Sequence, residues 1–122
     1  MIFVRSFFEV ADNTGATGAK CIKVVRKRTQ SNFCVGDFLI VAIQTAKPRK
    51  KVKKGEVRQA VLIRQKKKIV RPDGFILCFS NNSIVLINKQ KNPLGTRIKG
   101  PVAQELRKNK YMKVISMAQA VI

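Results

Sequence analysis

The residues of this chain best able to do chemistry are its cations, which are both numerous and clustered. Lys and Arg number 26 against 6 Asp and Glu, so the formal net charge is +20. A folded domain this positive repels itself unless an anionic partner compensates the charge. Nucleic acid is the commonest such partner, and an acidic membrane surface is the alternative.

Nearly half of these cations lie between residues 47 and 71, in two groups on either side of an apolar run. The groups are Lys47–Lys54 and Arg64–Arg71, and the run is Val57 to Ile63. If the run is a strand, its ends lie about 20 Å apart, so one folded polyanion could touch both groups. The alternative is that the two groups are solvated loops that only keep the protein soluble. Such loops would mix positive and negative charges, but only Glu56 and Asp73 lie nearby. We therefore predict contact with phosphates.

Catalysis is not expected from the remaining polar residues. The chain has no His, and its six acids are scattered without an adjacent pair. The glycines form no phosphate-loop pattern, and Cys34 has no base beside it. The cysteines, Cys21, Cys34 and Cys78, form no CxxC pair, so we expect reduced thiols that pack as small hydrophobes in a reducing compartment. We predict no enzymatic activity, no cofactor and no metal.

Base stacking is also a weak expectation. The chain has no Trp, one Tyr and seven Phe, most of which lie in or beside apolar runs where core packing is expected. Single-strand binders present exposed aromatic side chains to the bases. We therefore expect recognition of RNA shape and backbone rather than of base sequence.

Short runs rich in Val and Ile, separated by turn residues, predict a mainly β fold. The predicted strands are Phe7–Ala11, Lys20–Val25, Phe38–Ile43, Val57–Arg64, Phe75–Phe79 and Ile84–Ile87. The third should be central, because it is apolar on both faces. The last two should form a hairpin, and the whole set a small barrel without exposed edges.

The C-terminal part should differ from the barrel within one domain spanning residues 1–122. Pro101 fits a first helical turn, and Val102 and Leu106 would share a face, so we predict a helix from Val102 to Lys108. Val114–Met117 is then expected to return as a strand. The barrel should cover about residues 1–98, and the helical tail about 99–122.

A run of spaced residues carries a family resemblance. Ala60 precedes the aliphatics Val61 to Ile63, and Asp73-Gly74, Phe79, Asn82 and Val85-Leu86 follow at fixed distances. This pattern resembles the signature of the ribosomal large-subunit protein family number fourteen, in its bacterial and organellar type. Further matches lie at residues 10–16, 21–24, 35–37, 52–55, 71–74, 95–98, 100–103 and 105–107.

The resemblance implies a closed five-stranded barrel with a projecting β-ribbon and a short C-terminal helical region. It implies binding to large-subunit rRNA, a face toward the small subunit with contact to its rRNA in an intersubunit bridge, and the large-subunit proteins numbered three and nineteen as neighbours. A ribosome silencing factor can dock on such proteins. The chain departs from the family pattern at Lys99, Gln104, Gln119 and Ala120, within the region of the C-terminal contacts.

Charge clustering and the resemblance together select the residues expected to contact rRNA phosphates and sugars. Arg is favoured where two donors can bind one phosphate. The predicted set is Lys23, Arg49, Lys50, Lys51, Lys53, Lys54, Arg64, Lys66, Lys67, Lys68, Arg71, Arg97 and Arg107.

Two other functions remain open. A cationic module with an OB-like barrel could bind generic single strands outside the ribosome. A membrane-surface binder would need an amphipathic helix with a broad apolar face; the N-terminus has no signal-peptide apolar region, and no stretch reaches the length of a membrane helix. Frequent Lys, Ile and Asn are typical of AT-rich coding, which favours a mitochondrial or plastid ribosome slightly over a bacterial cytoplasm.

Overall fold

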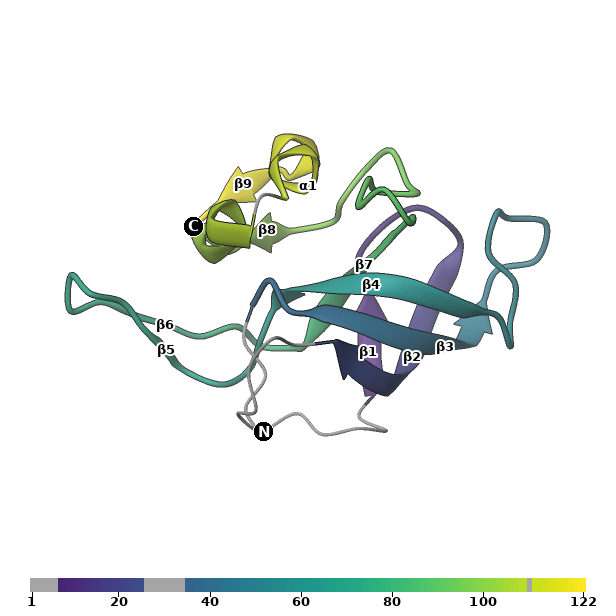
Figure 1. Ribbon diagram of the computed structural model, residues 1–122, viewed down its shortest axis with the longest axis horizontal. Helices are drawn as coiled ribbons and strands as arrows, with labels where there is room; N and C mark the ends of the chain where they lie inside the picture. Colours follow the sequence, from purple (N-terminus) through teal and green to yellow (C-terminus); the bar gives the residue numbers. More distant parts are fainter. Residues whose placement is uncertain (1–6, 26–34, 110) are drawn as a thin grey trace.

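Five strands form a closed barrel in the computed structural model, which describes residues 7–25, 35–109 and 111–122. The strand order is β1-β2-β3-β4-β7 (Figure 1). The bounds are Phe7–Val10 for β1, Ala16–Val25 for β2, Phe38–Ala46 for β3, Val57–Arg64 for β4 and Ser83–Ile87 for β7. The predicted mainly β barrel is confirmed. In a closed barrel no strand is central, and β3 is fully buried only along the face that points into the barrel, so the prediction of burial on both faces of this run is wrong.

The barrel closes through a parallel pair of strands. β1 runs parallel to β7, with Glu9 opposite Ser83 and Val10 opposite Ile84, whereas the other barrel neighbours are antiparallel. Each of the five strands therefore has a partner on both sides. This closure protects the barrel strands from pairing with another chain.

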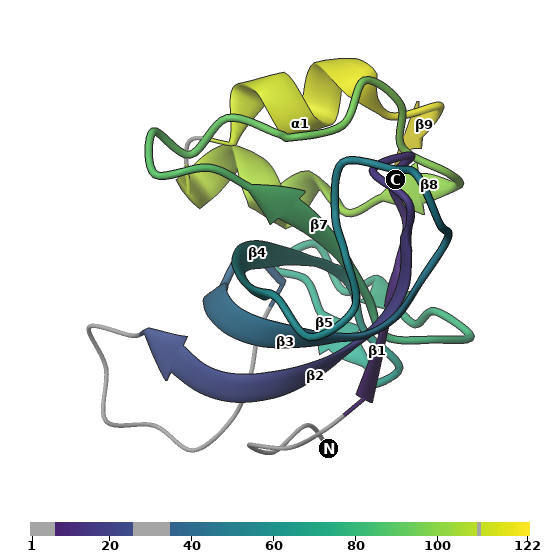
Figure 2. The ribbon, with the colours of Figure 1, turned by 90° about the vertical axis from the view of Figure 1, so that its right-hand side faces the viewer.

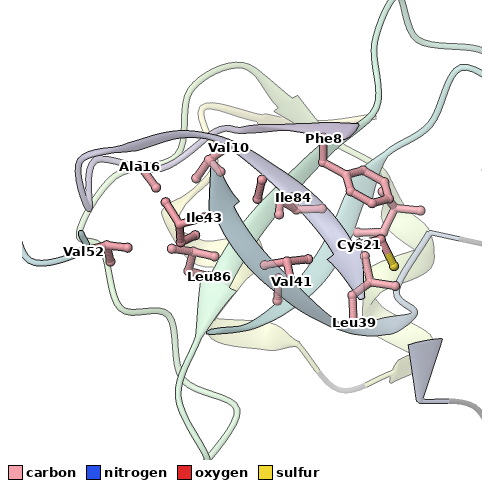
Figure 3. Packing of buried hydrophobic residues seen from close by; sticks show 13 residues of the cluster. Phe8, Val10, Ala16, Cys21, Leu39, Val41, Ile43, Val52, Ile84 and Leu86 are labelled. Carbon is pink, nitrogen blue, oxygen red and sulfur yellow. The ribbon is translucent and has the colours of Figure 1, made fainter. Parts of the chain in front are cut away.

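Alternate side chains of the barrel strands fill its interior (Figure 3). Phe8, Leu39, Val41 and Leu86 are all fully buried there. Val52 comes from the loop between β3 and β4, yet it is only 1% exposed and lies at one end of the cluster, near Ala16 and Ile43 in Figure 3.

A second layer covers the outer face of β4 and β7 (Figures 1 and 2). It contains β8 (Pro101–Val102), the 3₁₀ helix η1 (Gln104–Asn109), α1 (Met112–Met117) and β9 (Ala120–Val121). Because side chains alternate along a strand, Ala60 and Leu62 face the barrel interior while Val61 and Ile63 face this layer. β4 is therefore buried on both faces toward its end.

A two-stranded ribbon projects from the barrel (Figure 1). β5 (Ile69–Val70) pairs antiparallel with β6 (Ile76–Leu77). The hairpin predicted between Phe75–Phe79 and Ile84–Ile87 is therefore wrong. β7 already pairs with β1 on one side and β4 on the other, so it has no edge left for β6. The fifth predicted strand, Phe75–Phe79, therefore belongs to the ribbon, as β6.

The predictions for the C-terminal segment also need correction. Pro101 and Val102 do not begin a helix but form β8, which pairs in parallel with β9. The helical turns start later, at Gln104, and are 3₁₀ turns, and residues 114–117 lie in α1 instead of a strand. Backbone hydrogen bonds to the chain end decide this, because the N–H of Ile122 donates to the carbonyl of Val102 at 2.9 Å. Val102 and Leu106 are both buried, as expected.

Some predicted core residues are exposed. Cys21 is buried, but Cys78 is exposed on the segment after β6, and Cys34 lies outside the described residues. Phe8 is buried, whereas Phe7 and Phe75 are exposed. The prediction that the Phe and Cys side chains pack in the core is therefore right for Phe8 and Cys21 and wrong for Phe7, Phe75 and Cys78. In the described ranges, no helix has the length and apolar character needed to cross a bilayer.

Candidate nucleic-acid interface

The first basic group is presented by the loop between β3 and β4. Along residues 51–53 the side chains alternate outward and inward, with Val52 packed in the barrel core between two exposed lysines. The apolar residue fixes the middle of the loop, so its cations must face solvent. The exposed cations are Lys47, Arg49, Lys50, Lys51, Lys53 and Lys54.

Backbone hydrogen bonds give this loop a defined shape. The N–H of Lys47 donates to the carbonyl of Gly15 at 2.8 Å, and the N–H of Gly55 donates to the carbonyl of Ile43 at 2.8 Å. Arg49 has a φ of +64°, a left-handed conformation that non-glycine residues adopt uncommonly. The cationic side chains therefore extend from fixed backbone positions.

The second basic group lies where β4 leads into the ribbon. Lys66, Lys67 and Lys68 are all exposed. The N–H of Lys66 donates to Oδ1 of Asn82 at 2.8 Å, and its carbonyl accepts from Sγ of Cys78 at 3.0 Å. The start of this group is therefore attached to the segment that returns from the ribbon.

The two groups lie at opposite ends of β4, as predicted. In Figure 1 the loop after β3 projects at one end of the barrel and the ribbon at the other. A ligand that touches both groups must span the length of β4. This geometry suits a folded polyanion with phosphates on two sides better than a small anion.

Arg64 differs from the other predicted contact residues, because its side chain is buried. It is 8% exposed, and its Nη1 donates to the carbonyls of Lys99 at 3.0 Å and Pro101 at 3.4 Å. Burial lowers the pKa of its guanidinium from the ordinary value. A Cβ on Gly100 would collide with Nη1, so the guanidinium occupies the space that this glycine leaves. The geometry supports a role in attaching the C-terminal layer to the barrel.

Arg71, at the end of the β5 side of the ribbon, is also engaged within the chain. Its Nε lies 2.8 Å from Oε1 of Glu105, and its Nη2 donates to the carbonyl of Ile122 at 2.5 Å. The hydrogen bond to Glu105 raises the pKa of Arg71. The ribbon is thereby attached to the C-terminal layer.

The other predicted residues are exposed and lie on segments of the chain outside the two groups. Lys23 lies on β2, Arg97 follows the turn at residues 95–96, and Arg107 lies on η1. Further exposed cations stand singly along the chain, so they give no clustering signal and were not predicted as contact residues. They include Lys20, Lys89, Lys91, Lys99 and Lys113.

A hollow of about 340 Å³ lies beside the first basic group. Its neutral side is fixed by Asn13, whose Oδ1 accepts the N–H of Thr96 at 2.8 Å and whose Nδ2 donates to Oγ1 of Thr96 at 2.8 Å. No local pattern in the sequence points to this site, because Asn13 and its partner Thr96 are 83 positions apart. The lining residues are Asn13, Thr14, Arg49, Lys50, Lys51, Gly95 and Thr96.

Asp12 holds this turn from beneath the surface. Its Oδ1 accepts the N–H and the hydroxyl of Thr14 at 3.2 and 2.6 Å, and its Oδ2 accepts the N–H of Leu86 at 3.0 Å. Burial raises the pKa of Asp12, and these hydrogen bonds oppose the rise. The carboxylate is thus used to join the turn to β7.

The stability of the protein should carry a pH-dependent contribution from Asp12. Because its folded pKa lies above its unfolded value of about 3.9, this contribution is fully present below the unfolded value and is lost as pH rises through the folded pKa. Urea unfolding across this range should show wild type gaining stability on acidification relative to Asp12→Asn. Parallel stability curves for the two proteins would contradict the assignment.

Among the described residues, the acids serve as structural partners. Glu9 accepts a hydrogen bond from Asn81, and Glu56 pairs with Arg58 at 2.7 Å, which lowers the pKa of Glu56. Within residues 7–25, 35–109 and 111–122, no three His, Cys, Asp or Glu side chains gather as metal ligands would. What the surface offers is fixed cations and hydrogen-bond donors, which can hold a phosphate backbone.

Comparison with known protein families gives a match over the full length of the chain. The family model described as ribosomal protein L14p/L23e matches residues 1–122.

Proposed function

The chain belongs to the ribosomal protein L14p/L23e family and is thus a structural protein of the ribosome, and we propose that it binds large-subunit rRNA through the phosphate backbone. One observation carries the proposal: two groups of exposed cations extend from fixed loops at opposite ends of β4. Neutralising several phosphates releases counterions and gives affinity without reading bases. A protein of this family is not expected to be an enzyme.

The contact surface that we propose is smaller than the set selected from sequence. Arg64 is buried and Arg71 is bonded to Glu105, so both are committed within the chain. The remaining members are exposed. They are Lys23, Arg49, Lys50, Lys51, Lys53, Lys54, Lys66, Lys67, Lys68, Arg97 and Arg107.

The ribbon supports a protein neighbour in the ribosome. Val70 and Phe75 are 74% and 71% exposed, and Ile76 beside them is also exposed. Apolar side chains gathered on a projecting element favour a protein surface over a phosphate backbone. The neighbours that we propose are the large-subunit proteins numbered three and nineteen.

A face toward the small subunit is part of the same proposal. It includes contact with small-subunit rRNA in an intersubunit bridge and docking of a ribosome silencing factor. Lys99 and Gln104, which depart from the family pattern, are both exposed, so the C-terminal surface offered to these partners has its own charge pattern. A mitochondrial or plastid ribosome is the compartment favoured by the codon-related composition.

Removing the three exposed lysines of the second basic group should weaken the salt dependence of RNA binding. For Lys66→Ala combined with Lys67→Ala and Lys68→Ala, we expect the slope of log affinity against log salt to fall by about one unit for each phosphate that the variant no longer neutralises. The matched control replaces Lys20, Lys89 and Lys113 with Ala and has the same net charge. Filter binding to folded large-subunit rRNA measures both. Equal slopes for the two triple variants would refute a specific role for this group.

Competition between RNAs separates the proposal from a generic single-strand module. The full chain should prefer folded large-subunit rRNA over random single-stranded RNA, and it should co-sediment with large subunits at moderate salt. The exposed Phe7 and Phe75 lie on β1 and beside the ribbon. Preference for the random strand would favour the OB-like module instead.

A further inference from the structure

We propose that the hollow beside the first basic group holds a single nucleotide unit of RNA, with its phosphate on the cationic side and its ribose 2′-hydroxyl on the neutral side. This inference rests on the proposed function and specifies one contact within it. Three segments far apart in the sequence build the hollow: residues 13–14, 49–51 and 95–96.

The walls of the hollow approach one another as closely as glycine allows. A Cβ on Gly15 would collide with Cβ of Lys50, and a Cβ on Gly95 would lie 2.6 Å from Oδ1 of Asn13. Gly15 also has a φ of +105°, which disfavours any other residue. Nζ of Lys51 donates to the carbonyl of Leu94 at 3.3 Å, which joins the basic loop to the opposite wall. The hollow is thus shaped before a ligand arrives.

The two sides of the hollow differ in chemistry. Arg49, Lys50 and Lys51 line one side, and no acid is among the lining residues. A phosphate diester carries the complementary negative charge, and the fork of Arg49 can donate to two of its oxygens.

The neutral side offers one O–H and one N–H that are not used in the hydrogen bonds between Asn13 and Thr96. Oγ1 of Thr96 accepts from Nδ2 of Asn13 at 2.8 Å, so its own hydroxyl proton is directed elsewhere. The amide of Asn13 has a second N–H beyond the one used in this bond. A ribose 2′-hydroxyl both donates and accepts, and it is the group that distinguishes RNA from DNA.

The volume of the hollow favours a ligand the size of one nucleotide unit. A volume of about 340 Å³ is at the lower end for ligand sites, which begin near ~300 Å³. One phosphate with its sugar fits such a space, whereas a stacked run of bases does not. The hollow is partly open to solvent, so the RNA chain can enter and leave it.

Two variants test the two sides of the hollow separately. Thr96→Val removes a hydroxyl without changing charge, and it should weaken binding to folded large-subunit rRNA about three- to tenfold with an unchanged salt slope. Arg49→Gln should reduce the magnitude of the slope of log affinity against log salt by about one unit. The control is Thr17→Val, because Thr17 is an exposed β2 residue whose hydroxyl is bonded to Thr45 at 2.6 Å, outside the hollow.

Acylation of RNA 2′-hydroxyls gives a direct readout. Wild type and Thr17→Val should protect one nucleotide that Thr96→Val leaves reactive. If wild type binds but the Thr96 and Arg49 variants behave like Thr17→Val, the hollow is not an RNA contact, while the proposed function stands. If wild type does not bind the rRNA at all, the proposed function itself fails. Saturation by inorganic phosphate, without 2′-hydroxyl protection, would reduce the hollow to an anion site and overturn the inference.

Discussion

Replacing Arg64 with Met should lower the free energy of unfolding by about 2 kcal/mol. Met keeps an unbranched apolar stem in the buried space but donates no hydrogen bond. The carbonyls of Lys99 and Pro101 would then lose the charged donor that reaches them at 3.0 and 3.4 Å. Part of the loss is offset, because Nε of Arg64 is buried without a partner in the described structure.

The control for this prediction is Arg58→Met. Arg58 forms a partly exposed ion pair with Glu56 at 2.7 Å, and such pairs contribute about 0–1 kcal/mol. Urea unfolding of both variants measures the difference. A stable Arg64→Met protein that instead lost one unit of RNA salt slope would restore Arg64 as a phosphate ligand and refute its structural role.

Truncating Leu106 to Ala should destabilise the whole chain by about 3 kcal/mol and still leave one unfolding transition. Leu106 is fully buried in the second core, against side chains from the outer faces of β4 and β7. Leu62 points into the barrel from the same strand. Because β4 belongs to both cores, weaker packing on one face should weaken the other. The single domain predicted over residues 1–122 depends on this coupling.

Unfolding of the two cores can be followed by two different spectroscopic signals of the unmodified chain. Tyr111 is the one tyrosine, the chain lacks Trp, and Tyr111 is only 4% exposed in the second core. Tyrosine fluorescence therefore reports the C-terminal layer, while far-ultraviolet circular dichroism is dominated by the barrel strands. The two transitions should coincide in wild type, Leu106→Ala and the barrel control Leu62→Ala. A fluorescence transition that precedes the other would divide the chain into two folding units.

Local patterns were enough to predict a barrel without exposed edges, but not which strands close it or how the C-terminal layer is built. The bounds of β4 match the prediction because Val57, Val61 and Ile63 are β-branched residues at alternate-face spacing between two polar loops. The Phe75–Phe79 segment looked like the partner of Ile84–Ile87, since neighbouring strands usually pair. Pairing of β7 with β1 depends on residues more than 70 positions apart, and no local pattern contains that information. The same holds for β8, whose partner is the end of the chain.

The candidate site was predicted as charge but not as geometry. Lys66 and Arg64 are two positions apart and equally cationic, yet one is exposed and the other is buried. Their difference comes from β4 ending between them, with Gly100 leaving room for the guanidinium. Asn13 and Thr96 carry no charge, so the hollow that they line could be found only once the two turns had been brought together.

The parallel pairing of β1 with β7 has a consequence for biogenesis. During synthesis Phe8 leaves the ribosome early, but its place in the core needs Ile84 and Leu86, which are made much later. The nascent chain must therefore expose apolar strands and both groups of cations together until translation is nearly complete. Long-range closure of this kind slows folding and prolongs the period in which a chain can aggregate or bind RNA indiscriminately. A chaperone or early capture by rRNA would protect the newborn protein during that delay.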